Sequence, residues 1–209
     1  MREKSMPPKH TCLGSSPSNN GGPTQILKHL WLGNREDAMN YDKLKKLSIS
    51  VVVNATEQLP NFHPDQMKYM KINIKDKETT DLRPHFAGVT QFIANAIDNG
   101  ESVLVHCVAG ASRSASFVIC YMMSKLGEQI SLLDAFRWCK ARRSCVQPNK
   151  MFLVQLAEIE IYFHNGCSSV AKRKEKLWTS FEMNELRREK VKGHLKSGMN
   201  VSLSPCVIM

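Results

Sequence analysis

The sequence predicts an α/β fold in which a mostly parallel central sheet is flanked by helices on both faces. Two observations support this fold class. Short apolar runs alternate along the chain with stretches whose apolar residues have helical spacing, and the run Ile49–Asn54 is largely apolar. Such a run is typical of a parallel sheet covered on both faces. Functional side chains are then expected at the carboxyl ends of the strands.

Strands are expected where short apolar runs are bounded by polar or turn-forming residues. They are Ile26–Leu27, Leu30–Leu32, Ile49–Asn54, Tyr69–Ile74 and Val103–His106. Gly33 breaks the second run, and the adjacent Asn34 is suited to cap the helix that follows.

Helices are expected where apolar residues recur every three or four positions. They run from Arg35 to about Leu47, from a first turn at Pro84 to Asn99-Gly100, from Ala115 to Leu126, from Leu132 to near Arg142-Arg143, and from Asn149 to His164. The segment from Ala115 to Leu126 is apolar all round, so we expect it to be buried. Gly127 is suited to end it.

The stretch VLVHCVAGASRSAS, residues 103–116, joins a predicted strand, a loop of small residues and the start of a predicted helix. Small side chains let the backbone curl around an anion with its N–H groups inward, and the helix dipole adds positive potential. Arg113 can grip two phosphate oxygens. A thiol in this field loses its proton easily, so Cys107 is predicted to be a thiolate nucleophile. Taken singly, Cys107 could be a buried inert thiol and Arg113 a surface charge, but their combination favours a site.

The predicted phosphate-binding residues are Val108, Ala109, Gly110, Ala111, Ser112 and Arg113. His106 has several interpretations: it orients the loop, favours ionisation of Cys107, or is a core histidine. A supporting role is favoured over direct acid–base work. Ser112 is expected to act only as part of the loop.

A polar loop, residues 75–86, carries two candidate general acids, Asp76 and Asp81. Breaking a phosphate ester releases a poor anionic leaving group, which a carboxylic acid must protonate. A mobile loop over the pocket suits that acid. On chemistry alone both aspartates qualify, and either could instead be a solvated loop charge.

The segment HCVAGASRS resembles the His-Cys-x5-Arg-Ser signature of the cysteine-dependent protein phosphatases. Its surroundings resemble the dual-specificity branch, and within it the catalytic domain of the MAP kinase phosphatases. Further similarity lies in VVVNATEQLPNF (51–62), KDKETTDL (75–82) and RRSCVQPNKMFLVQL (142–156). The resemblance extends from about Thr24 to His164 and implies a protein tyrosine phosphatase-like fold.

This resemblance assigns roles to particular residues. It places Asp76, rather than Asp81, at the general-acid position. It gives Ser114 the stabilisation of the departing thiolate, although a helix N-cap is its alternative role. It makes Asn149 a support for the active-site loop. Arg142 and Arg143 match a basic pair of the family, which we expect to be a solvated face rather than an anion site.

The expected reaction hydrolyses phosphotyrosine and phosphoserine or phosphothreonine in proteins, with a MAP kinase as a candidate substrate. Cys107 forms a phosphocysteine, and water then cleaves it. No cofactor is expected, and no metal, because no Cys/His cluster has ligand spacing. A phosphoinositide or other non-protein phosphatase is an alternative, disfavoured because positions 108–112 carry no charge. A phospho-binding scaffold would need a broken nucleophile.

Composition bounds the setting of this activity. The chain has 209 residues, a net charge of +10 and seven cysteines. The charge suggests an anionic partner, but the basic stretch from Lys172 to Lys196 lacks the aromatic pattern of a nucleic-acid binder. An odd cysteine number without a signal peptide favours a reducing compartment, the cytoplasm or the nucleus.

Three regions are expected along the chain. Residues 1–23 read as a disordered leader, 24–165 as the catalytic domain and 166–209 as a basic tail. The last residues, Cys206-Val207-Ile208-Met209, have the C-a-a-X form that favours farnesylation of Cys206. One prenyl chain anchors weakly, so the basic tail would supply a second membrane signal.

Overall fold

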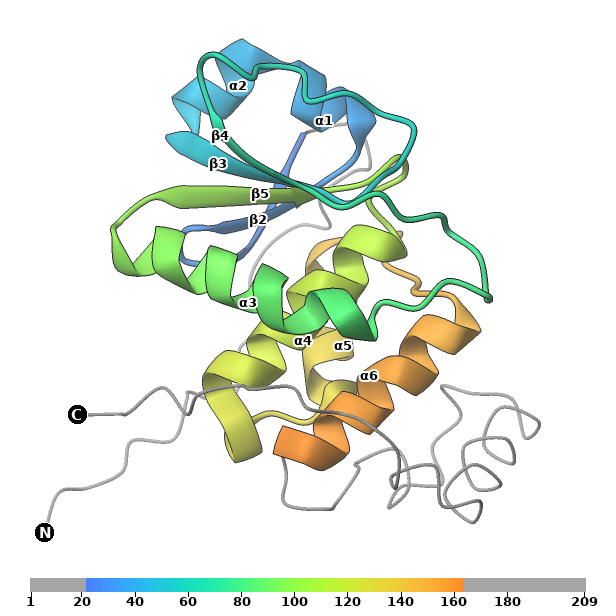
Figure 1. Cartoon of the computed structure of the whole chain (residues 1–209). Coiled ribbons are helices and arrows are strands. Elements are labelled where there is room, and N and C mark those ends of the chain that lie inside the picture. The colour runs from blue at the N-terminus through green and yellow to red at the C-terminus, as the bar shows by residue number, and fades with distance from the viewer. Residues whose placement is uncertain (1–21, 164–209) are drawn as a thin grey trace, which may run out of the picture.

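A five-stranded sheet forms the centre of the described residues, 22–163, in the computed structural model (Figure 1). The strands are β1 (Thr24–Leu27), β2 (Leu30–Gly33), β3 (Ile49–Asn54), β4 (Lys68–Lys71) and β5 (Ser102–His106). Their order across the sheet is β1-β2-β5-β3-β4. Only the pairing of β1 with β2 is antiparallel within the described residues, so the mostly parallel sheet expected from the sequence is confirmed.

Helices cover both faces of this sheet, as predicted, but unequally (Figure 1). The short helices α1 (Arg35–Met39) and α2 (Tyr41–Lys46) lie on one face. The other face carries the longer helices α3 (Arg83–Asp98), α4 (Arg113–Leu126), α5 (Leu132–Arg142) and α6 (Lys150–Phe163). A short 3-10 helix, Gly127–Gln129, follows α4.

Each face has its own apolar core because consecutive side chains of a strand point to opposite faces. On β5, Val103 and Val105 belong to the larger core against α3–α6, whereas Leu104 belongs to the smaller core under α1 and α2. Every residue of β5 is buried. The strand that ends at the predicted nucleophile is therefore held between both cores.

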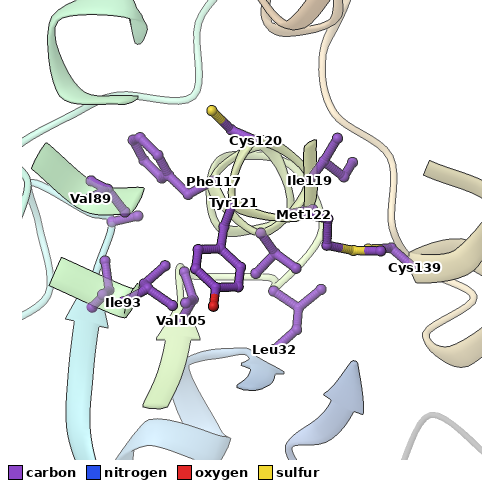
Figure 2. Packing of buried hydrophobic residues seen from close by; sticks show 14 of the residues in the cluster. Leu32, Val89, Ile93, Val105, Phe117, Ile119, Cys120, Tyr121, Met122 and Cys139 are labelled. Carbon is purple, nitrogen blue, oxygen red and sulfur yellow. The ribbon is translucent and has the colours of Figure 1, made fainter. Parts of the chain in front are cut away.

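Helix α4 is the centre of the larger core. Residues 113–123 are all buried, as predicted, whereas the last turn, Ser124 to Leu126, was also expected to be buried but is exposed. Figure 2 shows its side chains extending in different directions, with Phe117 toward Val89 of α3 and Met122 toward Cys139 of α5. The ring of Phe117 also makes an edge contact with Phe86, at a centroid separation of 5.9 Å. Burial of this helix fixes the direction in which its N-terminus points.

Two predicted boundaries were wrong. The single helix expected from Arg35 to Leu47 is interrupted at Asn40, because the Asn40 side chain accepts a hydrogen bond from Lys43 N (3.0 Å) and starts a new helix. The strand expected to reach Ile74 ends at Lys71. Beyond it, Ile72 N still donates to Asn54 O, but Ile74 N donates to Ile72 O in a tight turn that opens the loop.

Predictions for the leader and the tail fall mostly outside the described residues. Residues 1–21 and 164–209 belong to this part of the chain, and it includes Cys206. Within residues 22–163, no helix combines the length and the apolar character needed to cross a bilayer.

Candidate active site

The predicted nucleophile lies where β5 ends, in the middle of the sheet between β2 and β3. The chain then turns through residues 107–112 and enters α4 at Arg113. In parallel sheets, ligands bind at the carboxyl ends of the strands, where the connecting loops can vary while the sheet stays the same. The fourteen-residue helix α4 directs the positive end of its dipole at the same loop.

The sulfur of Cys107 accepts two short hydrogen bonds. Gly110 N–H donates to Cys107 Sγ over 3.2 Å, and Ser114 Oγ lies 3.1 Å from the same sulfur. Both donors stabilise a thiolate more than a thiol, because a charged acceptor makes the stronger hydrogen bond. Cys107 is only 1% exposed, so water contributes little to this solvation.

The other buried cysteines are in a different situation. Burial raises the pKa of Cys139 to about 12 and also raises that of Cys120, which keeps both thiols protonated. Among the described residues, Cys107, Cys120, Cys139 and Cys145 are all free thiols. Cys107 differs in sitting at a helix N-terminus with donors aimed at its sulfur.

Arg113 is held in place by the two loops that border the site. Its Nη1 donates to the carbonyl oxygen of Ile74 and to Gln58 Oε1, both over 3.3 Å. Its Nε is buried and makes no hydrogen bond within residues 22–163. The residue is only 4% exposed, and the carboxylate of Asp76 lies 3.6 Å from Nε, beyond hydrogen-bond distance. Nε is therefore a buried donor that an oxygen of a phosphate would satisfy.

The two candidate acids are clearly separated by the structure. Asp76 Oδ1 accepts from Ser112 Oγ (2.7 Å) and from Asn149 Nδ2 (3.0 Å), and Asp76 Oδ2 lies 3.6 Å from Arg113 Nε. Asp81 instead binds the partly exposed Arg83, whose hydrogen bonds lower the pKa of this carboxyl group. Asp76 therefore reaches the site, as the resemblance implies, and Asp81 does not.

Asn149 and Ser112 tie this acid to the rest of the site. Asn149 N–H donates to Ser112 Oγ (3.2 Å), and Asn149 Oδ1 caps α6 by accepting from Phe152 N (3.0 Å). Asn149 thus contacts both the loop residue Ser112 and Asp76. Ser112, predicted to be no more than a loop hydroxyl, is the link between the loop, the acid and α6. Ser112 also occupies the N-cap position of α4. Ser114, for which the N-cap was an alternative role, lies inside the helix.

His106 is buried beside the ring of Phe62, with ring centroids 6.3 Å apart. Burial lowers its pKa to about 4, although an interaction with the Cys107 backbone opposes this shift. Neither ring nitrogen makes a hydrogen bond of normal geometry to a described residue. The ring is therefore neutral at neutral pH and brings no positive charge to Cys107.

The structure reveals two further residues at the site that sequence reasoning missed. Gln58 contacts Arg113, and no local pattern distinguishes it from any other loop glutamine. Arg143 was expected on a solvated face, yet its side chain is 10% exposed and its Nε donates to Gly110 O (3.1 Å). Its partner in the basic pair, Arg142, does lie outside the loop, with its guanidinium 3.4 Å from the centre of the Trp138 ring.

An open cleft of about 670 Å³ lies beside the site. It is lined by Glu57, Asn73, Ile74, Lys75, Thr80, Asp81 and His85. Ile74 also accepts a hydrogen bond from Arg113, so the cleft is adjacent to the loop of residues 107–113. Within residues 22–163, no three His, Cys, Asp or Glu side chains are grouped so that they could hold a metal ion.

Comparison with known proteins gives consistent matches. The profile described as "Dual specificity phosphatase, catalytic domain" matches residues 30–161. Protein phosphatase Slingshot of Drosophila melanogaster is 37% identical over 183 residues, which are 88% of this chain and 16% of Slingshot. Dual specificity protein phosphatase 14 of Mus musculus is 38% identical over 140 residues, 67% of this chain and 70% of that protein. The crystal structure of human DUSP28 has a TM-score of 0.65 and 26% identity, covering 71% of this chain and 98% of that structure.

Proposed function

Since the chain belongs to the dual specificity phosphatase family, we propose that it dephosphorylates proteins with Cys107 as nucleophile, Arg113 as phosphate ligand and Asp76 as general acid. The supporting observation is the arrangement of hydrogen-bond donors around Cys107. The Cys107 sulfur accepts from Gly110 N–H and Ser114 Oγ, next to a buried Arg113 Nε without a hydrogen bond to any described residue. The chain spans only 16% of the length of Slingshot, so this proposal concerns the catalytic region that both share.

In the first step, the Cys107 thiolate attacks phosphorus while the ester P–O bond breaks. The sulfur–phosphorus bond forms as Asp76 gives its proton to the leaving oxygen, which departs as an alcohol or phenol. Arg113 and the loop N–H groups stabilise the charge that the phosphoryl oxygens carry in the transition state. The helix dipole of α4 acts in the same direction.

In the second step, water attacks phosphorus and the sulfur–phosphorus bond breaks. Asp76, now ionised, accepts a proton from the water, so the enzyme returns to its starting state and inorganic phosphate leaves. Ser114 Oγ, already 3.1 Å from the sulfur, stabilises the thiolate as it departs. Its removal should slow this step more than the first.

A phosphorylated protein is the proposed substrate, with a MAP kinase activation loop as the first candidate. Two observations favour a peptide over a highly charged phosphoinositide. Positions 108–112 of the loop are uncharged, so the loop offers no extra cations. The neighbouring cleft carries Glu57 and Asp81 as well as Lys75 and His85, and such a mixed lining suits the varied side chains of a peptide.

The test compares wild type with Cys107→Ser on singly and doubly phosphorylated activation-loop peptides and on a phosphoinositide. We expect wild type to release phosphate from the peptides, and the variant to bind them with no turnover. Phosphoinositide hydrolysis that exceeds peptide hydrolysis would replace the proposed substrate class. Turnover that survives Cys107→Ser would overturn the mechanism.

We also propose that farnesylated Cys206 and the basic tail hold the protein at the cytoplasmic face of a membrane. The support is the C-a-a-X sequence and the lysines and arginines before it. In cells, Cys206→Ser should shift the protein from the membrane pellet to the supernatant. An unchanged distribution between the two fractions would refute the anchor.

A further inference from the structure

The phosphate-binding loop, residues 107–113, is held from outside by donors to its carbonyl groups. Arg35 N–H donates to Val108 O (3.0 Å), and Gln147 N–H donates to Ala111 O (2.8 Å). A loop that turns its N–H groups toward an anion turns carbonyl groups away from it, and buried carbonyl groups need partners. These two contacts come from backbone N–H groups, which are present whatever the side chains are.

The carbonyl of Gly110 depends on a side chain instead. Arg143 Nε donates to Gly110 O over 3.1 Å, and the thiol of Cys145 makes only a long contact of 3.9 Å to the same oxygen. Gly110 is also the residue whose N–H donates to Cys107 Sγ. The two peptide groups that flank Gly110 are therefore bound by different partners: the N–H of one by the Cys107 sulfur, and the carbonyl of the other by Arg143.

Arg143 is itself anchored to the first part of the chain. Its Nη1 donates to Thr24 Oγ1 (3.3 Å), and its Nη2 lies 3.5 Å from Asp37 Oδ2. Asp37 is part of the capping box of α1, in which its carboxylate accepts from Asn34 N (2.9 Å). Both side chains of the ion pair are about nine-tenths buried, so solvent screens it little. The guanidinium is fixed by a rigid element on each side.

Gly110 has little freedom to move away from this contact. Its φ is +66°, and a Cβ placed on it would lie 2.5 Å from Gly33 O and 2.7 Å from Arg143 Nη2. The loop is therefore packed directly against the end of β2 and against Arg143. A loss of the Arg143 side chain leaves a space on that side of the peptide, into which the loop can relax.

We propose that Arg143, paired with Asp37, is a positioning residue for the reaction. It holds the carbonyl group of Gly110, and this keeps the N–H of the same residue facing the Cys107 sulfur and the phosphate. It does not touch the substrate, and its effect passes through the loop backbone. This inference rests on the proposed function for its consequence in turnover, but its effect on anion binding is separate from turnover.

The experiment measures inorganic phosphate binding by calorimetry and kcat and KM for para-nitrophenyl phosphate, on full-length variants. For Arg143→Gln we expect phosphate binding and kcat/KM to weaken by about tenfold each, because a small misplacement of a catalytic group has large effects. Arg143→Lys keeps the charge and one donor, so it should recover part of both losses. Asp37→Asn should fall between wild type and Arg143→Gln.

Arg142→Gln is the matched control, because Arg142 stacks on Trp138 and donates to Trp138 O rather than to the loop. It should bind phosphate and turn over like wild type. If Arg143→Gln fails to fold, Arg143→Lys and Asp37→Asn decide the question, and wild-type phosphate affinity in both overturns the inference. A lower melting temperature with unchanged phosphate affinity and kcat would make the role merely structural. Absence of turnover in the wild type would contradict the proposed function, while the phosphate titrations would still test the inference.

Discussion

Asp76 and Asp81 stand on one loop, yet their side chains meet different partners. Asp76 contacts Ser112 and Asn149 at the site, whereas Asp81 is bound to Arg83 at the surface. Residue type could not separate them, since both are loop aspartates before a helix. Position relative to the nucleophile separates them, and that position is a property of the fold.

We predict that Asp76→Asn lowers kcat on phosphotyrosine peptides by about 100-fold or more, because the leaving oxygen loses its proton donor. Asp81→Asn should keep kcat within about twofold of wild type, since its carboxylate is bound to Arg83 rather than to the residues around Cys107. Steady-state kinetics at pH 6–7 provide the measurement. The assignment fails if the two variants lose activity equally.

His106 should make the protein sensitive to mild acid. Its pKa is lowered from 6.5 to about 4 by burial, so the folded state disfavours the protonated ring. Above pH 6.5 the ring is neutral in both the folded and the unfolded state, so the free energy of unfolding has its full value. As the pH falls from 6.5 toward 4, only the unfolded state takes up the proton, and the free energy of unfolding decreases. The loss between pH 7.5 and pH 5 is about 2 kcal/mol.

Urea unfolding of wild type and His106→Asn at these two pH values measures this contribution. The variant should be less stable at pH 7.5 but should lose less stability on acidification than wild type. His85→Gln, at a partly exposed position lining the cleft, serves as the control for the removal of a histidine. Equal acid sensitivity in wild type and His106→Asn would show that other groups cause it.

At the scale of elements, α4 connects the core to the chemistry. The same helix buries Phe117 in the larger core and directs its N-terminus at the proposed phosphate site. Phe117→Ala should lower the free energy of unfolding by about 3–5 kcal/mol, through lost apolar burial and the cavity left behind. Leu126→Ala, at the exposed end of the helix, should cost less than about 1 kcal/mol. Thermal and urea unfolding measure both variants. Equal free energies of unfolding would contradict the prediction.

The elements show where sequence reasoning succeeded and where it failed. The all-round apolar pattern of α4 and the apolar run of β3 were sufficient, because burial follows directly from side-chain chemistry. The break at Asn40 was missed, because an asparagine in a helical pattern can either stay in the helix or cap a new one. The early end of β4 was missed because Ile72 and Ile74 are buried like strand residues although they lie in a turn.

At the scale of the whole molecule, α6 holds together parts that are distant in sequence. Buried Gln155 accepts from Leu82 N (2.7 Å) and donates to Thr80 O (3.0 Å), at the end of the loop that carries Asp76. Buried Glu160 accepts from Leu132 N (2.7 Å) at the start of α5. Neither contact could be predicted from local pattern, because each depends on the packing of α6 against the other elements.

Gln155→Leu should therefore lower both stability and turnover. It leaves the buried Leu82 N–H without a partner, which costs about 1–3 kcal/mol. It also frees the loop before α3, so kcat should fall while Cys107 and Arg113 remain in place. Glu158→Gln on the same helix, where the side chain is partly exposed in its pair with Arg83, should change stability by less than about 0.5 kcal/mol. Urea unfolding and turnover of a small ester distinguish the two variants.

The site as a whole was predictable to the extent that one contiguous motif encodes it. Cys107, Arg113 and the small residues between them are adjacent in sequence, and their loop lies where the strand and helix patterns put it. Only the tertiary contacts show that Gln58 and Arg143 belong to the site and that Ser112 links the loop to Asp76. These residues come from segments whose approach is set by packing in three dimensions.

The position of β5, paired on both sides and buried along its whole length, has a consequence over evolutionary time. The sulfur of Cys107 is positioned by the most constrained part of the fold, while Glu57, Lys75 and His85 line the neighbouring cleft. Substitutions at these margins can change which partner is recognised without dismantling the scaffold under the sulfur. If the proposed function holds, the set of protein substrates can diverge in this way while the chemistry at Cys107 stays the same.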